Sequence, residues 1–440
     1  MNAKTLAAVV LALVSVGAAC AQGEYEETTA KYQMTYNWQR HPAFNSPYEG
    51  LNSMPGDADK MYTLSLTAHW GVRLWSGGEL YFNPELASGV PFSKKLIGLG
   101  GFTNGEITRA AGNELKPYRQ RLFVRQTWNQ GGGLEHLPSD FNQMAGTVER
   151  YRTVLTVGNF SVLDVFDKNT YAKDPRTQFM NWGNWTYSSW DYAADARGFG
   201  WGFSLEFYKA DWVTRLARMT GPKEPNSPAL DFNLLRHYGD QFEIERAHTV
   251  GHKPGKIRLL YYRNRAVLAS FSDAAAYLLA NNPTDRQAIL NVRNDEKTKQ
   301  GIGLNIEQRL SDSVGFFFRG MKTDGKTETY AFTEVDNSAS IGLLIKGSKW
   351  GRPVDSVGLS LMANYLSAER RRFLELGGIS YFIGDGRLQY SPETIFEGFY
   401  SWTIAKRFWL TGDYQRIQNP AYNSDRGPVN VMAIRLHAAL

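Results

Sequence analysis

Residues 62–73 read YTLSLTAHWGVR, and this stretch decides the fold. Apolar side chains occupy every second position from Tyr62 to Val72, and polar residues or glycine lie between them. Because successive side chains of a β-strand point to opposite faces, the pattern predicts a strand with one apolar and one polar face. Twelve alternating residues exceed the mean soluble strand of about 5–6 and suit the roughly 9–11 residues of a tilted membrane-spanning strand.

The same period recurs along the chain. Residues 31–39 alternate in this way, with Tyr32, Met34, Tyr36 and Trp38 on the apolar face. Comparable stretches lie near 78–85, 118–128, 148–159, 199–208, 211–220, 241–250, 256–265, 301–310, 314–322, 338–347, 355–365, 394–404, 408–417 and 429–440. Together they make about sixteen segments, and a single-chain membrane barrel needs an even number.

The connections between these segments alternate in length. The short ones are rich in turn-forming residues: Ser76–Gly78, Lys253–Gly255, Ser311–Ser313, Trp350–Pro353 and Ala405–Arg407. The long ones include 160–198, 266–300 and 366–393. This asymmetry is typical of an all-β transmembrane antiparallel barrel with short periplasmic turns and long extracellular loops. In the final segment Arg435 and His437 oppose the apolar face, and a last strand at the chain's end could close against the first.

The composition is compatible with this reading. After residue 21 no apolar stretch approaches the roughly 20 residues of a membrane helix, yet the chain has 12 Trp, 23 Tyr, 24 Phe and 42 Gly. Composition alone would also suit a large soluble β-sandwich or propeller, whereas the strand pattern favours a barrel. The net charge of +6 is spread along the chain without a basic, aromatic-interleaved stripe, which argues against nucleic-acid binding.

The first 21 residues predict an export signal. Lys4 precedes an apolar run from Leu6 to Val16, and Ala19-Cys20-Ala21 suits cleavage before Gln22. The alternative is a lipoprotein cleaved before Cys20, but Gly17 stands where such a signal usually has a large aliphatic residue. We therefore expect one outer-membrane domain over residues 22–440, with no disulfide or thiolate site.

One segment identifies the expected lumen. Arg119, Arg121 and Arg125 share a face with Phe123 and Thr127. On a lipid-facing wall each arginine near the midplane would cost about 2–4 kcal/mol, so this face should line the water-filled interior. We hypothesise that this arginine ladder and facing carboxylates form the constriction of a pore.

Further charged residues occupy inward positions of their own strands. They are Arg73, Arg258, Arg319, Arg435, Glu79, Glu85, Glu206, Glu307, Glu397 and Asp413. A wall with both signs can hydrogen-bond neutral polyols without excluding them. The alternative for any one of them is that it only pairs with a neighbour and braces the barrel.

The segment 164–176 is polar, aromatic and too long for a turn, so it either folds inward and narrows the pore or faces outward. Its candidate constriction residues are Asp164, Asp167, Lys168, Asp174 and Arg176. The three aspartates could also hold a hard divalent cation, although their spacing matches no EF-hand. We expect no resident cofactor.

Several motifs together resemble the carbohydrate-selective porins of the OprB type. They are residues 78–85 (GELYFNPE), 98–106 (GLGGFTNGE), 174–182 (DPRTQFMNW) and 419–423 (NPAYN). The likeness covers nearly all of the chain after the signal. It implies a sixteen-stranded barrel that passes monosaccharides, often as a monomer, although some similar chains carry a manganese-porin label.

The expected function is passive, selective diffusion of small sugars or similar polar solutes across the bacterial outer membrane. A manganese-selective porin and an outer-membrane hydrolase are the alternatives. For the hydrolase, His69 and His437 are lumen candidates, but no GxSxG motif is present, and we expect no enzyme. The expected partners are outer-membrane lipid and the barrel-assembly machinery, and both a monomer and a homotrimer remain open.

Overall fold

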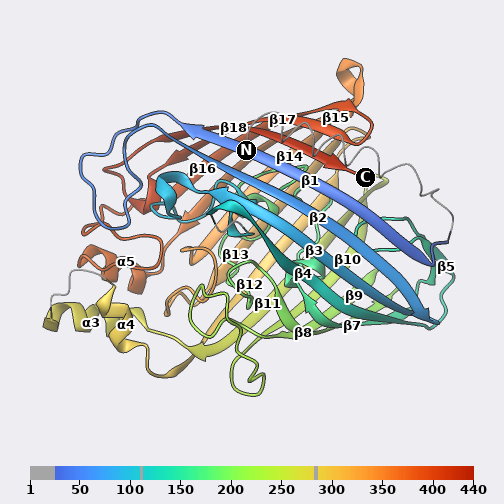
Figure 1. Cartoon of the computed structure of the whole chain (residues 1–440), viewed down its shortest axis with the longest axis horizontal. Helices are drawn as coiled ribbons and strands as arrows, with labels where there is room; N and C mark the ends of the chain where they lie inside the picture. Colours follow the sequence, from blue (N-terminus) through green and yellow to red (C-terminus); the bar gives the residue numbers. More distant parts are fainter. Residues whose placement is uncertain (1–24, 110–111, 282–285) are drawn as a thin grey trace.

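The computed structural model describes residues 25–109, 112–281 and 286–440. Sixteen antiparallel strands close into a barrel, and β1 completes the ring by pairing with both β2 and β18 (Figure 1). The predicted fold class and number of strands are confirmed. The predicted signal over residues 1–21 lies outside the described residues.

The bounds of the barrel strands follow the alternating segments. They are β1 Thr28–His41, β2 Asp59–Trp75, β3 Gly78–Val90, β4 Gly112–Asn129, β7 Arg152–Phe160, β8 Gly200–Lys209, β9 Trp212–Met219, β10 Tyr238–Val250, β11 Lys253–Val267, β12 Glu296–Arg309, β13 Val314–Thr323, β14 Asn337–Gly347, β15 Arg352–Tyr365, β16 Glu393–Ala405, β17 Phe408–Gln418 and β18 Val429–Ala439.

Short and long connections lie at opposite ends of the barrel (Figure 1). The turn between β10 and β11 is Gly251–His252, and the prediction of a turn at Lys253–Gly255 is wrong. Both turn residues have positive φ, as a two-residue hairpin turn requires. The connection from β4 to β7 is longer and contains an unpredicted hairpin, β5 Leu134–Leu137 with β6 Gly146–Glu149. Residues 148–149 therefore pair with β5 and do not begin β7.

The helices are short and lie in the connections. They are η1 Phe92–Lys94, η2 Gly105–Arg109, η3 Val162–Asp164, α2 Trp182–Trp185, α3 Phe271–Asn281, α4 Gln287–Val292, η4 Ser348–Trp350, α5 Ala368–Glu375 and η5 Pro420–Tyr422. Among the described residues, no helix is both long and apolar enough to cross a membrane.

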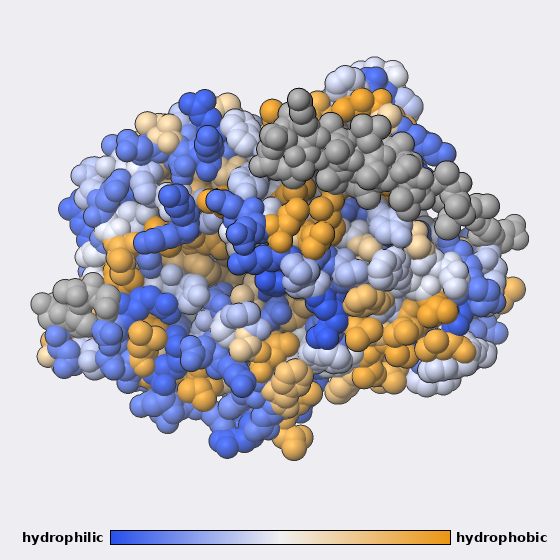
Figure 2. Space-filling view, in the orientation of Figure 1, coloured by the Kyte–Doolittle hydropathy of each residue, from blue (hydrophilic) through white to orange (hydrophobic). Residues whose placement is uncertain are grey.

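The two faces of the wall differ as the alternation predicts. Exposed outward residues are mainly aliphatic or aromatic, and Figure 2 shows apolar side chains gathered over the strands. Examples from several strands are Trp70, Phe203, Phe207, Leu259, Tyr261, Ile302, Ile341, Leu361, Tyr400, Met432 and Ile434. The inward positions of β1 are instead the buried polar residues Gln33, Thr35, Asn37 and Gln39.

The protein's main core lies inside the ring. The connection between β7 and β8, residues 161–199, enters the barrel and carries α2 with it. Its Trp182 ring lies 4.8 Å from Trp185 and 5.0 Å from Phe332 of the β13–β14 connection, measured between centroids. Because these side chains fill part of the interior, only the remaining space is available to a solute.

Candidate functional site

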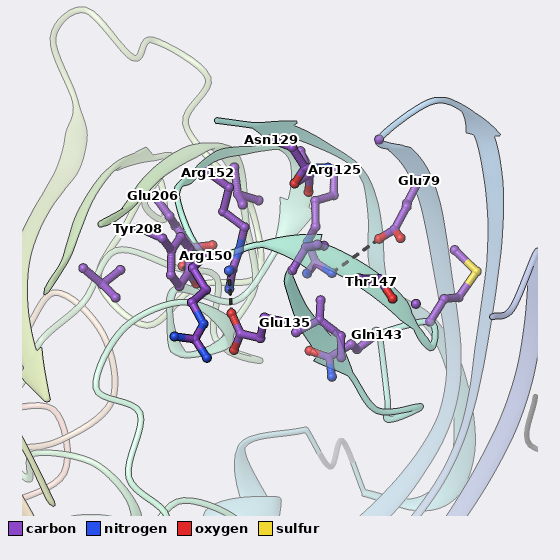
Figure 3. Close-up of a pocket in the computed structure, with 18 of the residues that line it drawn as sticks. Glu79, Arg125, Asn129, Glu135, Gln143, Thr147, Arg150, Arg152, Glu206 and Tyr208 are labelled. Atoms are coloured by element: carbon purple, nitrogen blue, oxygen red, sulfur yellow. Dashed lines mark hydrogen bonds and ion pairs between the residues drawn. The ribbon is translucent and has the colours of Figure 1, made fainter. Parts of the chain in front are cut away.

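A cavity of ≈ 1210 Å³ enters the barrel from the end with short turns. Its rim includes the turn residues Gly77 and Asp211, and its inner end reaches Asp164, Val165 and Lys168 of the β7–β8 connection. Side chains from several strands converge on it (Figure 3). This cavity is the candidate pore, and the 161–199 connection, hereafter the inserted loop, lines its inner end.

The arginine ladder is split between the two faces of the wall. Arg125 lines the cavity, and Arg121 binds Asp164 of the inserted loop. Arg119 lies exposed over the Trp201 ring, 4.9 Å from its centroid. Tyr118 and Gln120, on either side of Arg119, both hydrogen-bond to inward-facing Glu85.

The expected lumen position of Arg119 is therefore corrected: its side chain points outward. A β-bulge explains the difference, because Asn83 pairs with Arg121 and the next residue, Pro84, pairs with Arg119. The extra residue, Gln120, shifts the alternation by one position.

The Arg121–Asp164 pair holds the start of the inserted loop. Arg121 donates from Nε and Nη2 to the two carboxylate oxygens at 2.7 and 2.6 Å, and its guanidinium lies 5.1 Å from the Phe199 ring centroid. Burial favours the neutral form of Asp164, but Arg121 outweighs it and lowers the pKa of that carboxyl. Burial also lowers the pKa of Lys168, which follows Asp164 by four residues in the inserted loop.

The inserted loop is fixed to inward residues all around the ring. Arg319 donates to Asp167 at 2.8 Å, and Glu307 accepts from the Thr170 backbone at 2.8 Å. Arg176 donates to Glu85 at 3.0 Å and to Glu106 at 3.1 Å. Glu397 accepts from the Met180 and Asn181 backbone at 2.6 and 3.1 Å, and Arg435 donates to the Pro175 carbonyl at 2.8 Å. These contacts place the loop inside the barrel.

The predicted inward residues thus divide into two groups. Arg73, Glu79, Phe123, Arg125 and Glu206 line the cavity. The others also face inward but contact the inserted loop or one another, and they do not line this cavity: Glu85, Arg258, Glu307, Arg319, Glu397, Asp413 and Arg435. The physical reason is that the loop occupies the space in front of their strands.

The three aspartates of the inserted loop do not share a site. Asp164 pairs with Arg121, Asp167 pairs with Arg319, and Asp174 accepts from the Arg176 backbone and from Thr177 within the loop. In the described part of the chain, no group of three or more His, Cys, Asp or Glu side chains is arranged to hold a metal ion. The possible cation site at these three aspartates is therefore corrected: each carboxylate has a separate partner.

The cavity wall combines charged hydrogen-bonding groups with aromatic faces. Glu79 accepts from Arg73 at 2.7 Å and from the Tyr81 hydroxyl at 2.8 Å, and Arg125 lies 3.9 Å away. The lining residue Phe123 stacks on buried Tyr81 with ring centroids 5.1 Å apart, and the rings of Tyr25, Phe141 and Tyr208 also line the cavity. The wall therefore presents donors, acceptors and ring faces side by side.

Sequence reasoning predicted Glu206 and Arg258 but missed Arg215, Glu243 and Glu245, with which they form a second charged cluster on β8 to β11. Arg215 of β9 donates to Glu206 at 3.2 Å, to Glu243 at 2.8 Å and to Glu245 at 3.1 Å. Arg258 reaches the same Glu245 at 2.7 Å. The available signal was the period of two, since Val213, Arg215 and Ala217 occupy alternate positions of their strand.

A closed ring of strands with an apolar exterior, a polar interior and a cavity entering it defines a membrane-spanning diffusion channel. The family model of carbohydrate-selective porins, the OprB family, matches residues 61–440, and the chain belongs to this family. It is a sugar porin of the bacterial outer membrane, so the short turns are periplasmic and the long loops extracellular.

Solved structures agree on the architecture. The chain is similar to the high-pH structure of OprB from Pseudomonas putida, with a TM-score of 0.66 and 16% identity over 94% of each chain. It is also similar to the outer-membrane channel DcaP of Acinetobacter baumannii, with a TM-score of 0.50 and 9% identity over 94% of this chain and 97% of that one. At these identities the likeness shows the fold. No curated protein matches the sequence.

Proposed function

We propose that neutral sugars of monosaccharide size cross the barrel through the cavity beside the inserted loop and pass the Arg121–Asp164 pair at its inner end. The observation that carries this proposal is the ≈ 1210 Å³ cavity lined by arginines, carboxylates and aromatic rings together. Hydroxyls of a sugar hydrogen-bond to the charged groups, and its apolar C–H faces pack on the rings.

The balance of charge favours neutral solutes over ions. Glu79 of β3 lies beside Arg73 and Arg125, and Glu206 of β8 lies beside Arg215. Because the positive and negative groups are paired, neither ion sign meets a strong attractive field along the cavity. A manganese channel would instead need carboxylates that converge without such partners.

Liposome swelling tests this proposal. Vesicles containing the purified porin are placed in isotonic solutions of a monosaccharide, a disaccharide or a charged amino acid of similar mass. We expect the monosaccharide to enter fastest and the charged solute to enter more slowly. Equal entry of the charged solute and the monosaccharide would show a nonselective pore.

We further propose that the chain is a channel without catalytic activity. The two buried histidines, His69 and His437, contact Gln33 at 2.8 Å and Thr35 at 2.9 Å. All four side chains are almost fully buried, so a substrate cannot reach these pairs. The proposal predicts that sugar influx occurs with no cleavage of lipid or added peptide in the same vesicles.

We also propose that residues 1–21 direct export and are removed, that residues 22–440 form one domain, and that the barrel-assembly machinery inserts it. The support is that the barrel is completed by strands from β1 at Thr28 to β18 at Ala439. N-terminal sequencing of the outer-membrane form should begin at Gln22.

A further inference from the structure

The connection between β4 and β7 departs from the rest of the periplasmic end. The other six connections at this end contain two to four residues, whereas this one spans residues 130–151 and carries the β5–β6 hairpin. We name residues 134–149 the periplasmic insert. Its Glu135, Gln143 and Thr147 lie beside Arg125 and Arg152 of the barrel wall (Figure 3), and they line the cavity.

One side of the insert is fixed to the first three strands and the residues before them. Glu26 accepts from the Ser139 hydroxyl at 2.6 Å and from the Ala145 backbone at 2.7 Å. The Phe141 ring lies 4.5 Å from the ring of His69 on β2. The Met144 and Ala145 side chains are each only 2% exposed, so this part of the insert is packed inside the mouth of the barrel.

The insert also engages three arginines that line the cavity. Arg73 donates to the Ala145 carbonyl at 3.0 Å, Arg125 donates to the Asn142 carbonyl at 2.9 Å, and Arg152 donates to the Glu135 carboxylate at 2.6 Å. Each contact compensates part of the positive charge of a wall residue. The insert therefore narrows the periplasmic exit of the cavity. It also makes the electrostatic field at this exit less positive.

The route back from β4 into the insert depends on glycine. Gly131, Gly132 and Gly133 all have positive φ, at 96°, 83° and 88°. L side chains rarely adopt this conformation, whereas glycine does so without strain. The chain therefore reverses sharply at three consecutive glycines to enter the insert, although a two-residue turn would be enough to join β4 to β7.

We propose that the periplasmic insert is a second selectivity filter, in series with the inserted loop, which sets the upper size of solute that leaves the barrel and suppresses anion preference at the exit. The proposal rests on the proposed function, because it assigns a further element to the same sugar path. A solute that passes the Arg121–Asp164 pair must still pass between the insert and the facing wall of β8 to β11, which also lines the cavity.

A deletion that preserves the barrel tests the proposal. Asn129 already pairs with Arg152, and the Tyr151 carbonyl accepts from the Gln130 backbone at 2.8 Å. Replacing residues 131–150 with Asn-Gly therefore leaves a standard hairpin turn. We expect oligosaccharides that the wild type excludes to swell liposomes of the variant, and single-channel conductance to rise several-fold.

The same variant should shift ion preference towards anions. The deleted segment contains three carboxylates, Glu135, Asp140 and Glu149, and one arginine, Arg150. Its removal also leaves Arg73, Arg125 and Arg152 without the contacts described above. Reversal potentials under a salt gradient measure this shift.

Point variants keep the test independent of the deletion's folding. The double variant E26A/F141A removes two contacts that hold the insert, and neither contact belongs to the hydrogen-bond ladder of the barrel strands. It should raise the size limit to a value between those of the wild type and the deletion variant. The matched control is D312A at another periplasmic turn, where the carboxylate contacts Lys253 and Arg309 and should leave the size limit unchanged.

Two failures are distinguishable. A folded deletion variant and E26A/F141A that both retain the wild-type size limit and ion preference would overturn the filter role of the insert. Exclusion of monosaccharides by the wild type itself would instead overturn the proposed function. Folding of each variant is checked by the electrophoretic shift between heated and unheated barrel.

Discussion

Arg319 and Asp167, which are 152 residues apart in the chain, meet inside the barrel with Nε and Oδ1 at 2.8 Å and both side chains at most 1% exposed. This pair joins the inserted loop to β13. Asn305 also donates to Asp167, and Arg319 donates to the Asn184 carbonyl at 2.7 Å. The single wall residue Arg319 thereby binds the inserted loop at two points, Asp167 and Asn184.

Removing one partner of this pair should be costly. D167A leaves the Arg319 guanidinium buried without its carboxylate, and such changes typically cost about 3–5 kcal/mol. We expect a lower free energy of unfolding in denaturant and noisier single-channel currents, because the loop loses an anchor. The control is D312A, whose ion pairs are solvent-exposed and contribute little to stability. Equal stability of D167A and D312A would contradict the anchoring role.

Because Arg119 faces outward whereas Arg121 and Arg125 face inward, these three arginines provide a test variant and a matched control. R121A/R125A removes two inward guanidiniums, and we expect higher conductance together with weaker block of the ion current by sugar. R119A removes the outward arginine over Trp201 and should leave both quantities unchanged. Unchanged conductance and sugar block in R121A/R125A would refute the constriction hypothesis.

The pH dependence of stability should include a lysine of the inserted loop. Burial lowers the pKa of Lys173 to about 7, with Asp167 opposing this effect and Arg319 and Lys168 adding to it. Between about pH 7 and the ordinary lysine value near 10.4 the unfolded chain binds the proton and the folded chain does not. The free energy of unfolding should therefore rise with pH in this window, by at most about 1.4 kcal/mol per pH unit.

Below pH 7 both states hold the proton, so this contribution to the pH dependence should vanish there. K173M cannot titrate and should lack the rise between pH 7 and 9. Denaturant unfolding of wild type and K173M at pH 6, 7, 8 and 9 measures the difference. Parallel pH profiles for the two proteins would show that Lys173 does not titrate as described.

Manganese should not bind the inserted loop. Asp164 and Asp167 are each engaged by an arginine, and Asp174 stabilises its own turn. A crystal soaked in Mn²⁺ should show no anomalous density beside these carboxylates, and the ion should not raise the melting temperature. Density shared by two of the three aspartates would revive the manganese channel as a function.

The sequence was sufficient to predict the strands because the alternation of apolar and polar side chains is a local property. Tyr62 to Arg73 carries the same signal whether or not its neighbours are known, and about sixteen such stretches imply closure. Local reasoning failed at Arg119, because the bulge at Gln120 depends on which residues of β3 lie opposite. The inward prediction for Arg121 and Arg125 does not depend on that pairing.

The contacts of the inserted loop could not be read from local patterns. Arg176 meets Glu85 and Arg435 meets the Pro175 carbonyl across separations of 91 and 260 residues. The residue types predicted that inward charges would need partners. They did not indicate whether each partner would be a solute, another wall residue or the inserted loop. The β5–β6 hairpin was missed for a different reason: its strands have four residues each, too few for a period to be evident.

The seam between β1 and β18 joins residues such as Thr35 and His437 from opposite ends of the polypeptide. The inserted loop comes from the middle of the chain and ends up enclosed by the ring that this seam completes. During biogenesis the aromatic filling must therefore be in place before the last two edges meet, or else fold in through the extracellular opening afterwards. Any apparatus that inserts this barrel must therefore coordinate the entry of the inserted loop with the closure of the seam between β1 and β18.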